Sequence, residues 1–324
     1  MRNIENRLTE DERCTLYVHA LNPIPDVEGV LDFDLDATLV DTALHAANHH
    51  RPLLQRWIND WRLTDLADLI TDGHGPYSQR QYVKDTLFLV EWLVLACRDL
   101  GRTFPLNPQD ALKASREYRK LLLESEKGIQ AFSGINEDLA LLRQNFPRAF
   151  MLLKTNCPDW LAPLRAGELL RHFDGIVSIR PWLPPIVDDD PYAIVLNDTR
   201  EWLDVQYKLT KREELQLHLA IPQHHAKPST LGLRAAIGYL ELSPSALRRI
   251  VLGGDDPTSE GVTALEVFKV HGGCEDPERA RFVHAAYAQY PNRESANATA
   301  IIDAVATTPQ ALCGEMERLY REDW

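Results

Sequence analysis

The segment FDLDATLVDT, residues Phe33–Thr42, decides the fold that this sequence predicts. A mostly apolar run from Val27 leads into it, which predicts a strand over 27–34 and a loop over 35–41. In a doubly wound sheet, ligands bind at the carboxyl ends of the strands, where Asp34 and Asp36 would lie. Two carboxylates this close repel each other unless a cation lies between them, and a hard cation such as Mg²⁺ prefers oxygen ligands. The alternative is that DLD forms only an acidic turn.

Apolar residues recur at helical spacing through the next hundred residues, which predicts a block of amphipathic helices over about 43–148. The clearest stripe contains Leu53, Leu54, Trp57, Ile58 and Trp61. This block would be a helical domain inserted after the first core strand. Its polar or cationic side chains include candidate substrate contacts, although an ordinary surface position is the favoured interpretation of each: His49, His50, Arg51, His74, Arg80 and Lys84.

Strand and helix patterns alternate after this block, which predicts an α/β fold, a Rossmann-like doubly wound parallel sheet. The expected core covers 1–42 and 149–324, with a second, smaller insertion over about 180–223. The expected strands are 148–153, 175–179, 249–253 and 266–270. The expected helices are 159–172, 228–240, 278–289 and 309–321. We expect the second insertion to act as an extra lid or a dimer contact.

FDLDATLVDT resembles the first motif of the haloacid dehalogenase (HAD) superfamily, DxDx[TV] after an apolar strand. The resemblance implies that Asp34 is the nucleophile, Asp36 the acid and base, and Thr38 a substrate-binding hydroxyl. Ala37 stands where the family usually has glycine. Asp32 is unusual, because apolar residues normally precede the nucleophile.

The second and third motifs of the family are a hydroxyl that ends a strand and a lysine near the start of a helix. FMLLKTN places Thr155 after an apolar run, with Asn156 beside it as a further substrate-binding candidate. HAKPSTLGLRAAI offers Lys227 before a proline that suits a first helical turn. Lys154 is a poorer candidate than Lys227, because it should point to the opposite face of its strand from Thr155.

The fourth motif is an acidic loop after a strand, and RRIVLGGDD supplies Asp255 and Asp256. The family's adjacent-acid form fits this pair. The common GDxxxD form would need an acid at Ser259 and fails, while Glu260 could substitute at the longer spacing. The resemblance therefore implies metal ligands from Asp34, Asp36, Asp255 and Asp256, with the choice between Asp256 and Glu260 left open.

Together these motifs imply a Mg²⁺-dependent phosphomonoester hydrolase that forms an aspartyl-phosphate, with the helical block as a type-1 cap that closes over the cleft. Its catalytic residues would be Asp34, Asp36 and Lys227. A phosphomutase or phosphotransferase with the same intermediate is an alternative, and so is a degenerate HAD-fold binding or regulatory protein. Dehalogenase chemistry is disfavoured, because dehalogenases of this fold have no acid at the position of Asp36.

The composition limits the kinds of partner that this protein is expected to bind. The 324 residues carry a formal net charge of −13, which opposes general binding to nucleic acid or anionic membranes. The expected partner is a small phosphorylated metabolite, and the expected state is a monomer or homodimer. The five cysteines form no CxxC pair, and the polar N-terminus resembles no signal peptide, so a reduced, cytoplasmic protein is expected. His224 and His225 could face the site beside Lys227, or form an exposed pair.

Overall fold

The computed structural model describes residues 17–20, 26–66, 69, 88–180, 189–209, 215–222, 230–268, 279–287 and 302–322. It divides into two compact units, each treated separately below. The core unit contains residues 1–43, 130–182 and 212–324, and the helical unit contains 44–129 and 183–211. Among the described residues, no helix has both the length and the apolar character needed to cross a membrane.

One eight-stranded sheet organises the core unit, in the order β1-β5-β4-β3-β2-β6-β7-β8. Its strands are β1 (Tyr17–Ala20), β2 (Gly29–Asp34), β3 (Ala149–Pro158), β4 (Gly175–Arg180), β5 (Leu217–Pro222), β6 (Ile250–Gly254), β7 (Arg281–Ala285) and β8 (Ala304–Ala306). All pairs are parallel except β1 with β5 at one edge. The doubly wound parallel sheet predicted from the sequence is confirmed.

Strand β2 lies at the point where the order of the sheet reverses. The chain runs outward through β3, β4 and β5, then returns to the other side of β2 and runs outward again through β6, β7 and β8. Ligands of open α/β sheets bind beyond the carboxyl ends of the strands at such a reversal. The topology therefore marks the ends of β2 and β6, where Asp34 and Asp255 lie.

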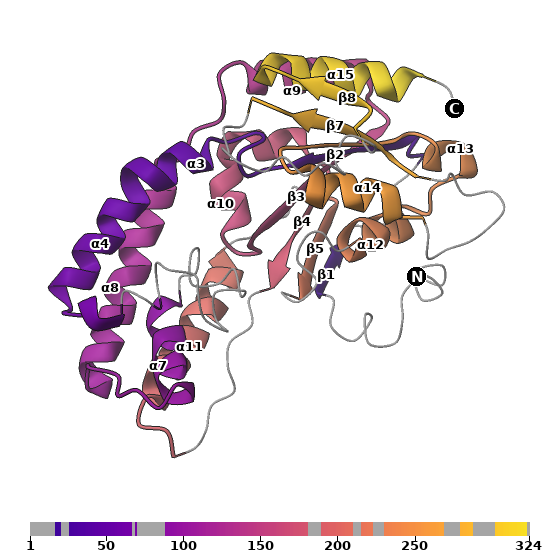
Figure 1. The fold of residues 1–324 in the computed structure, drawn as a ribbon. Helices are drawn as coiled ribbons and strands as arrows, with labels where there is room; N and C mark the ends of the chain where they lie inside the picture. Colours follow the sequence, from indigo (N-terminus) through magenta and orange to yellow (C-terminus); the bar gives the residue numbers. More distant parts are fainter. Residues whose placement is uncertain are drawn as a thin grey trace. The chain divides into compact units, whose positions relative to one another are not determined.

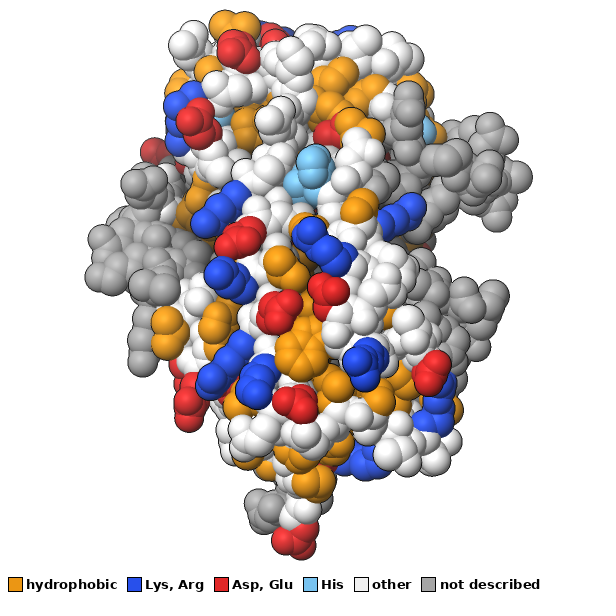
Figure 2. Space-filling model, turned by 90° about the vertical axis from the view of Figure 1, so that its left-hand side faces the viewer, with side chains coloured by type: hydrophobic (Ala, Val, Ile, Leu, Met, Phe, Trp, Pro, Cys, Tyr) orange, Lys and Arg blue, Asp and Glu red, His pale blue; other side chains and the backbone are white. Residues whose placement is uncertain are grey.

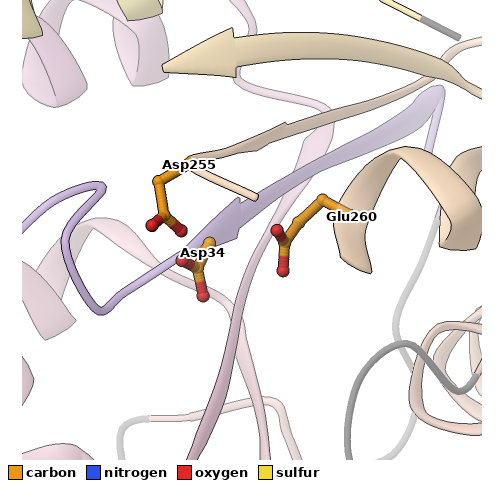
Figure 3. Close-up of side chains that lie close together, drawn as sticks. All are labelled: Asp34, Asp255 and Glu260. Atoms are coloured by element: carbon orange, nitrogen blue, oxygen red, sulfur yellow. The ribbon is translucent and has the colours of Figure 1, made fainter. Parts of the chain in front are cut away.

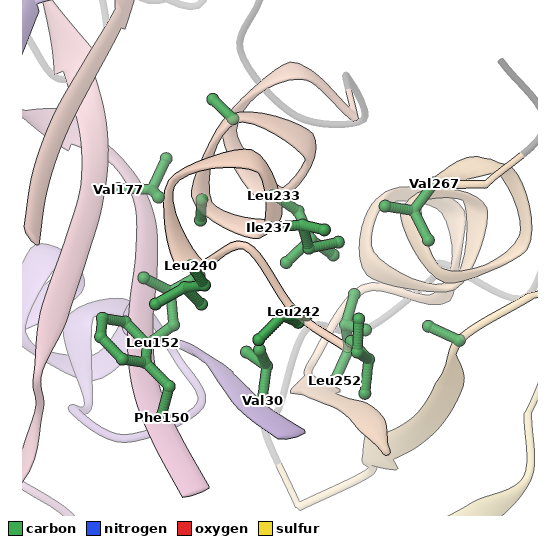
Figure 4. Packing of buried hydrophobic residues seen from close by; sticks show 14 of the residues in the cluster. Val30, Phe150, Leu152, Val177, Leu233, Ile237, Leu240, Leu242, Leu252 and Val267 are labelled. Carbon is green, nitrogen blue, oxygen red and sulfur yellow. The ribbon is translucent and has the colours of Figure 1, made fainter. Parts of the chain in front are cut away.

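Helices of the core unit cover this sheet (Figure 1). The core unit contains α9 (Ile135–Asn145), α10 (Ala162–Ala166), η3 (Gly167–His172), α12 (Leu231–Leu240), α13 (Pro244–Leu247), η5 (Pro257–Gly261), α14 (Val262–Glu266) and α15 (Pro309–Arg321). Val30 and Leu152 belong to a buried cluster with Leu233 and Ile237 of α12 (Figure 4). Burying such side chains contributes about 1.5–3 kcal/mol each, which fixes the strands that carry the site.

The described part of the helical unit contains η1 (Ala46–His50), α4 (Arg51–Asp60), η2 (Thr64–Leu66), α7 (Leu89–Asp99), α8 (Pro108–Glu126) and α11 (Ala193–Leu209). The short helix α3 (Thr42–His45) begins in the core unit, whose first stretch ends at residue 43. Asn107 caps α8 by accepting a hydrogen bond from the backbone N–H of Asp110. Among the coloured residues of the face drawn in Figure 2, Lys and Arg are interspersed with Asp and Glu, so these described residues form no extended surface of a single sign.

Several sequence predictions need correction. The sequence predicts a helix over 278–289, but Arg281–Ala285 forms β7. It predicts a strand over 266–270, but Glu266 ends helix α14. Both segments mix a few apolar residues with charged ones over a short length, so their pattern fits either a strand or a helix, which explains both errors.

The boundaries of the insertions also differ from those expected. Helix α9 lies within the expected block 43–148, yet it belongs to the core unit. Strand β5 lies within the expected insertion 180–223, yet it pairs with β4 in the sheet. Helix α11, from the same insertion, belongs to the helical unit.

Candidate active site

Three carboxylates converge at the ends of β2 and β6 (Figure 3). Asp34 is the last residue of β2, Asp255 follows β6, and Glu260 lies in the turn η5. One ligand oxygen from each lies within 4.8 Å of the other two. Asp34 and Glu260 are buried, at 4% and 2% exposure. Like charges held this close in low dielectric repel strongly, so the arrangement is suited to a cation.

The loop after β6 explains why Glu260 reaches the cluster. The backbone N–H groups of Ser259 and Glu260 both donate to the Asp256 carbonyl at 2.9 Å. The resulting turn brings the Glu260 carboxylate back to accept from the Asp256 N–H at 3.2 Å. A Cβ at Gly254 would overlap the Glu260 side chain, so this approach requires glycine at the end of β6.

Asp256 itself is not one of the three converging carboxylates. Its backbone forms the turn, and it is Glu260 that places an oxygen beside Asp34 and Asp255. Of the two alternatives that the sequence left open for the second acid, the geometry favours Glu260. All three donors are carboxylate oxygens, the ligand type that Mg²⁺ prefers, so the residues present fit this ion.

A tight loop carries the chain from Asp34 to Thr38. The Thr38 hydroxyl donates to Asp34 Oδ2 at 3.1 Å. Ala37 adopts a φ of 62°, in the left-handed region that favours glycine. The Tyr287 hydroxyl donates to the Thr38 carbonyl at 2.5 Å. Burial raises the pKa of Tyr287 well above its usual range, and the nearby charges of Cys313, Asp255 and Asp34 add to this shift. Tyr287 thus remains a neutral donor that steadies the loop.

Asp36 and Thr155 meet across the site. The Thr155 hydroxyl donates to Asp36 Oδ2 at 2.6 Å and accepts from the Cys157 N–H at 2.8 Å. Arg165 of α10 donates to the other oxygen, Asp36 Oδ1, at 2.7 Å. The register of β3 shifts between Lys154 and Pro158, beside this contact. Asn156 is exposed in this segment.

Lys154 and Asp32 form a buried ion pair. Their charged atoms lie 3.5 Å apart, and the side chains are 4% and 1% exposed. This pair accounts for an acidic residue inside the otherwise apolar strand β2, because a buried charge is tolerated when it is paired.

Lys227 lies outside the described residues, as do His74, Arg80, Lys84, His224 and His225. His49 stacks on His45 within the helical unit, with ring centroids 4.8 Å apart. No sequence pattern pointed to Arg165 as a partner of Asp36. Tyr287 was missed because its segment was misassigned as a helix.

Burial lowers the pKa of His284, although a hydrogen bond with the Asp255 backbone and the charge of Asp256 oppose this shift. This histidine lies on β7, the strand beside β6. Its neutral form is therefore favoured next to the acidic loop.

Comparison with known proteins gives a mixed result. No protein-family model matches the sequence, and a search of curated proteins found no relative. The fold is similar to solved structures of HAD-superfamily proteins. A 2-haloacid dehalogenase from Pseudomonas syringae pv. Tomato DC3000 has a TM-score of 0.47 and 14% identity, covering 90% of this chain and 98% of its own.

A protein from Thermotoga maritima described as a β-phosphoglucomutase has a TM-score of 0.47 and 16% identity, covering 90% of this chain and 99% of its own. A protein from Haemophilus somnus 129PT described as a predicted phosphoglycolate phosphatase has a TM-score of 0.47 and 15% identity, with coverages of 90% and 99%. At these scores and identities, the likenesses add nothing about chemistry to what the site geometry supports.

Proposed function

We propose that this chain is a Mg²⁺-dependent phosphomonoester hydrolase of the HAD superfamily that acts on a small phosphorylated metabolite. The observation that carries the proposal is the convergence of Asp34, Asp255 and Glu260 within 4.8 Å, where the order of the sheet reverses. Such a cluster suits a cation and a phosphate between strand ends.

The proposed metal ligands are the carboxylates of Asp34, Asp255 and Glu260, with the Asp36 backbone carbonyl. Bound Mg²⁺ would supply positive charge that offsets the negative charge of phosphate and carboxylates. Asp34 is the proposed nucleophile. The hydrogen bond from Thr38 orients its carboxylate and leaves lone pairs on both oxygens for attack and metal binding.

The proposed reaction has two displacements at phosphorus. An Asp34 oxygen attacks, the bond to the leaving oxygen breaks, and the electron pair departs with that oxygen, which receives a proton from Asp36. Water then attacks the aspartyl-phosphate, gives its proton to the Asp36 carboxylate, and displaces Asp34 with release of inorganic phosphate. Thr155 and Lys227 are the proposed phosphate-binding residues, with Asn156 as a further candidate.

The presence of Asp36 as a proposed general acid and base distinguishes this function from dehalogenation. Asp36 lies within 2.6 Å of the proposed phosphate-binding hydroxyl of Thr155, so one group can serve the leaving oxygen while the other binds phosphate. Displacement of a halide needs no proton donor. The position of Asp36 therefore supports phosphoryl transfer.

The test measures hydrolysis of an aryl phosphate with and without Mg²⁺, in the unaltered chain and in Asp34→Asn. We expect Mg²⁺-dependent release of phosphate, and a loss of about 10³-fold or more in the variant. Acid quenching with ³²P-labelled substrate should trap label on the unaltered protein and none on Asp34→Asn. Asp99→Asn is the control, because Asp99 is an exposed residue of the helical unit. Metal-independent release, or full activity in Asp34→Asn, would contradict the proposal.

A panel of phosphorylated metabolites, assayed for phosphate release, then tests which class of substrate the protein hydrolyses. A substrate from which phosphate is released with kcat/KM well above that of the aryl phosphate would identify the class. Conversion of a sugar phosphate to an isomer without phosphate release would instead identify a mutase.

A further inference from the structure

Arg165 makes a close contact with the proposed acid and base. Its terminal nitrogen lies 2.7 Å from Asp36 Oδ1, while Thr155 donates to Oδ2 at 2.6 Å. The side chains of Arg165 and Asp36 are 13% and 27% exposed, so the ion pair is largely shielded from water. Each oxygen of the carboxylate thus receives a donor, which fixes both of its side-chain torsions.

The guanidinium is carried by an element tied to the same strand as Thr155. Helix α10 begins four residues after the end of β3 and packs against that strand. The Arg165 N–H donates to the Leu161 carbonyl at 3.0 Å, within this first turn. The two donors to Asp36 therefore come from one continuous β-α segment, and Asp36 comes from the loop after β2.

The two donors differ in what they can do when substrate binds. The Thr155 hydroxyl has one proton, so it cannot donate to Asp36 and to a phosphate oxygen at the same time. Arg165 has five donor hydrogens in a fixed plane and stays charged. If Thr155 turns to the phosphate, Arg165 is the group that still holds Asp36 in place.

We propose that Arg165 is a positioning residue that orients Asp36 toward the leaving oxygen of the substrate. This inference rests on the proposed function. In the step concerned, the Asp34 oxygen–phosphorus bond forms, the bond to the leaving oxygen breaks, and that oxygen takes its proton from Asp36. A misplaced Asp36 slows this transfer most when the leaving group is a poor one, because an alkoxide needs the proton and a nitrophenolate does not.

The experiment compares kcat/KM for p-nitrophenyl phosphate and for an alkyl phosphate, because kcat/KM reports the step in which the leaving group departs. We expect Asp36→Asn to lose about 10²-fold or more with the alkyl phosphate and far less with the aryl phosphate. Arg165→Gln should show the same selectivity, with a loss of about 10-fold or more on the alkyl phosphate. The double variant should be no worse than Asp36→Asn, because both changes act through one group.

Two further variants separate positioning from other roles. Arg165→Lys keeps a cation that reaches Asp36, and we expect it to recover part of the alkyl-phosphate activity. Arg171→Gln is the matched control, since Arg171 lies in η3 and contacts Asn136 of α9 and His172, so that this variant should show no leaving-group selectivity. Inhibition by inorganic phosphate should be unchanged in Arg165→Gln, because Arg165 is not proposed to bind the phosphate.

Several results would overturn the inference. If Arg165→Gln raises the inhibition constant of inorganic phosphate and lowers kcat/KM equally for both substrates, Arg165 is a phosphate ligand. A lowered melting temperature with unchanged leaving-group selectivity would make it a structural residue, and additive losses in the double variant would separate it from Asp36. If Arg165→Gln does not fold, Arg165→Lys decides, because equal losses on both substrates would also refute positioning. Absence of any Asp34-dependent release by the unaltered chain would instead overturn the proposed function, and this inference with it.

Discussion

The two units bury carboxylates in opposite ways. In the core unit, Asp34, Asp255 and Glu260 converge at strand ends with their ligand oxygens within 4.8 Å of one another. In the helical unit, Glu91 is 1% exposed and accepts hydrogen bonds from Ser115 and Thr199. Convergence of like charges is costly unless a ligand compensates it, whereas the single carboxyl of Glu91, with both donors on Oε1 and its pKa raised by burial, can be accommodated in its protonated form. Buried charge alone therefore does not mark a site, but buried like charges at strand ends do.

The network around Glu91 also explains where the second inserted segment belongs. Ser115 lies on α8 and Thr199 on α11, so one carboxylate of α7 links three helices. Asp198 of α11 forms ion pairs with Arg116 and Arg119 of α8. Arg119 also lies over the ring of Trp202, 5.2 Å from its centroid. Polar contacts thus join α11 to α8 across 79 and 82 residues and to α7 across 108, in keeping with a structural role for these charges.

The largest effect expected on stability comes from Asp198→Asn. Arg119 is 3% exposed, and the change would remove the carboxylate that forms its ion pair, while its electrostatic interaction with Glu91 would remain. Breaking such a pair costs about 3–5 kcal/mol, while the exposed Arg116 adds little. Chemical denaturation should show this loss for the helical unit. Glu201→Gln, on an exposed position of α11, should stay within about 0.5 kcal/mol. Equal stability of the two variants would show that the network is not structural.

Removal of a carboxylate from the core cluster should affect metal binding more than folding. For Glu260→Gln and Asp255→Asn, we expect the Mg²⁺ concentration at half-maximal activity to rise about 10- to 100-fold or more. Independently of activity, Mg²⁺ should raise the melting temperature of the unaltered chain and do so less in both variants.

Asp256→Asn is the matched control for this prediction. Its backbone builds the turn that positions Glu260, and that backbone is kept in the variant. The Mg²⁺ requirement should therefore change little. A larger change in Asp256→Asn than in Glu260→Gln would restore Asp256 as the second acid.

The sequence predicted the core sheet because the runs over 27–34, 148–153, 175–179 and 249–253 are mostly apolar and bounded by loops. It also identified Asp34, Asp36, Thr155 and Asp255 as candidates, since each follows an apolar strand whose parallel pairing brings the strand ends together. It could not choose between Asp256 and Glu260, because that choice depends on the turn at 256–260 and on the space left by Gly254.

Other features depend on contacts across long separations. Arg165 and Asp36 are 129 residues apart, and no local pattern marks an arginine that will meet a given carboxylate. The membership of α11 in the helical unit depends in the same way on Glu91 and Thr199, which are 108 residues apart. Strand β7 was misassigned because its five residues, RFVHA, are too few to distinguish a buried strand from a helix.

The pH dependence of stability provides a further test of how the helical unit accommodates its buried carboxyl group. Burial raises the pKa of Glu91 above its ordinary value of 4.5, and hydrogen bonds from Thr199 and Ser115 with the charge of Arg119 offset this only in part. The folded state therefore binds this proton more tightly than the unfolded state. The resulting stability is fully present below pH 4.5 and is lost as the pH rises through the folded pKa. Every tenfold increase in proton affinity on folding corresponds to about 1.4 kcal/mol.

Glu91→Gln removes this titration. We expect its free energy of unfolding, relative to the unaltered chain, to improve between about pH 4.5 and about pH 7.5. Denaturation at both pH values provides the measurement, and Glu124→Gln, on an exposed position of α8, should show no such trend. The difference in the free energy of unfolding between Glu91→Gln and the unaltered chain could instead stay constant across this pH range. Glu91 would then be ionised in the folded state at no cost.

The smallest effect concerns backbone strain beside the nucleophile. Ala37 has a φ of 62°, where an L-residue loses roughly 1–2 kcal/mol that glycine does not. Glycine also makes the unfolded chain more flexible, at a cost of about 0.5–1 kcal/mol, so Ala37→Gly should be neutral or stabilising by up to about 1 kcal/mol.

Ala114→Gly, at a position with helical backbone geometry, should have the opposite effect on stability. Ala114 is fully buried in the interior of α8, and glycine there should cost about 1 kcal/mol or more. Denaturation of the two variants compares them directly. A loss at Ala37 as large as the loss at Ala114 would mean that the loop after β2 stores no strain. Changes in stability of opposite sign in the two variants would mean that the loop that carries Asp36 stores backbone strain and that α8 stores none.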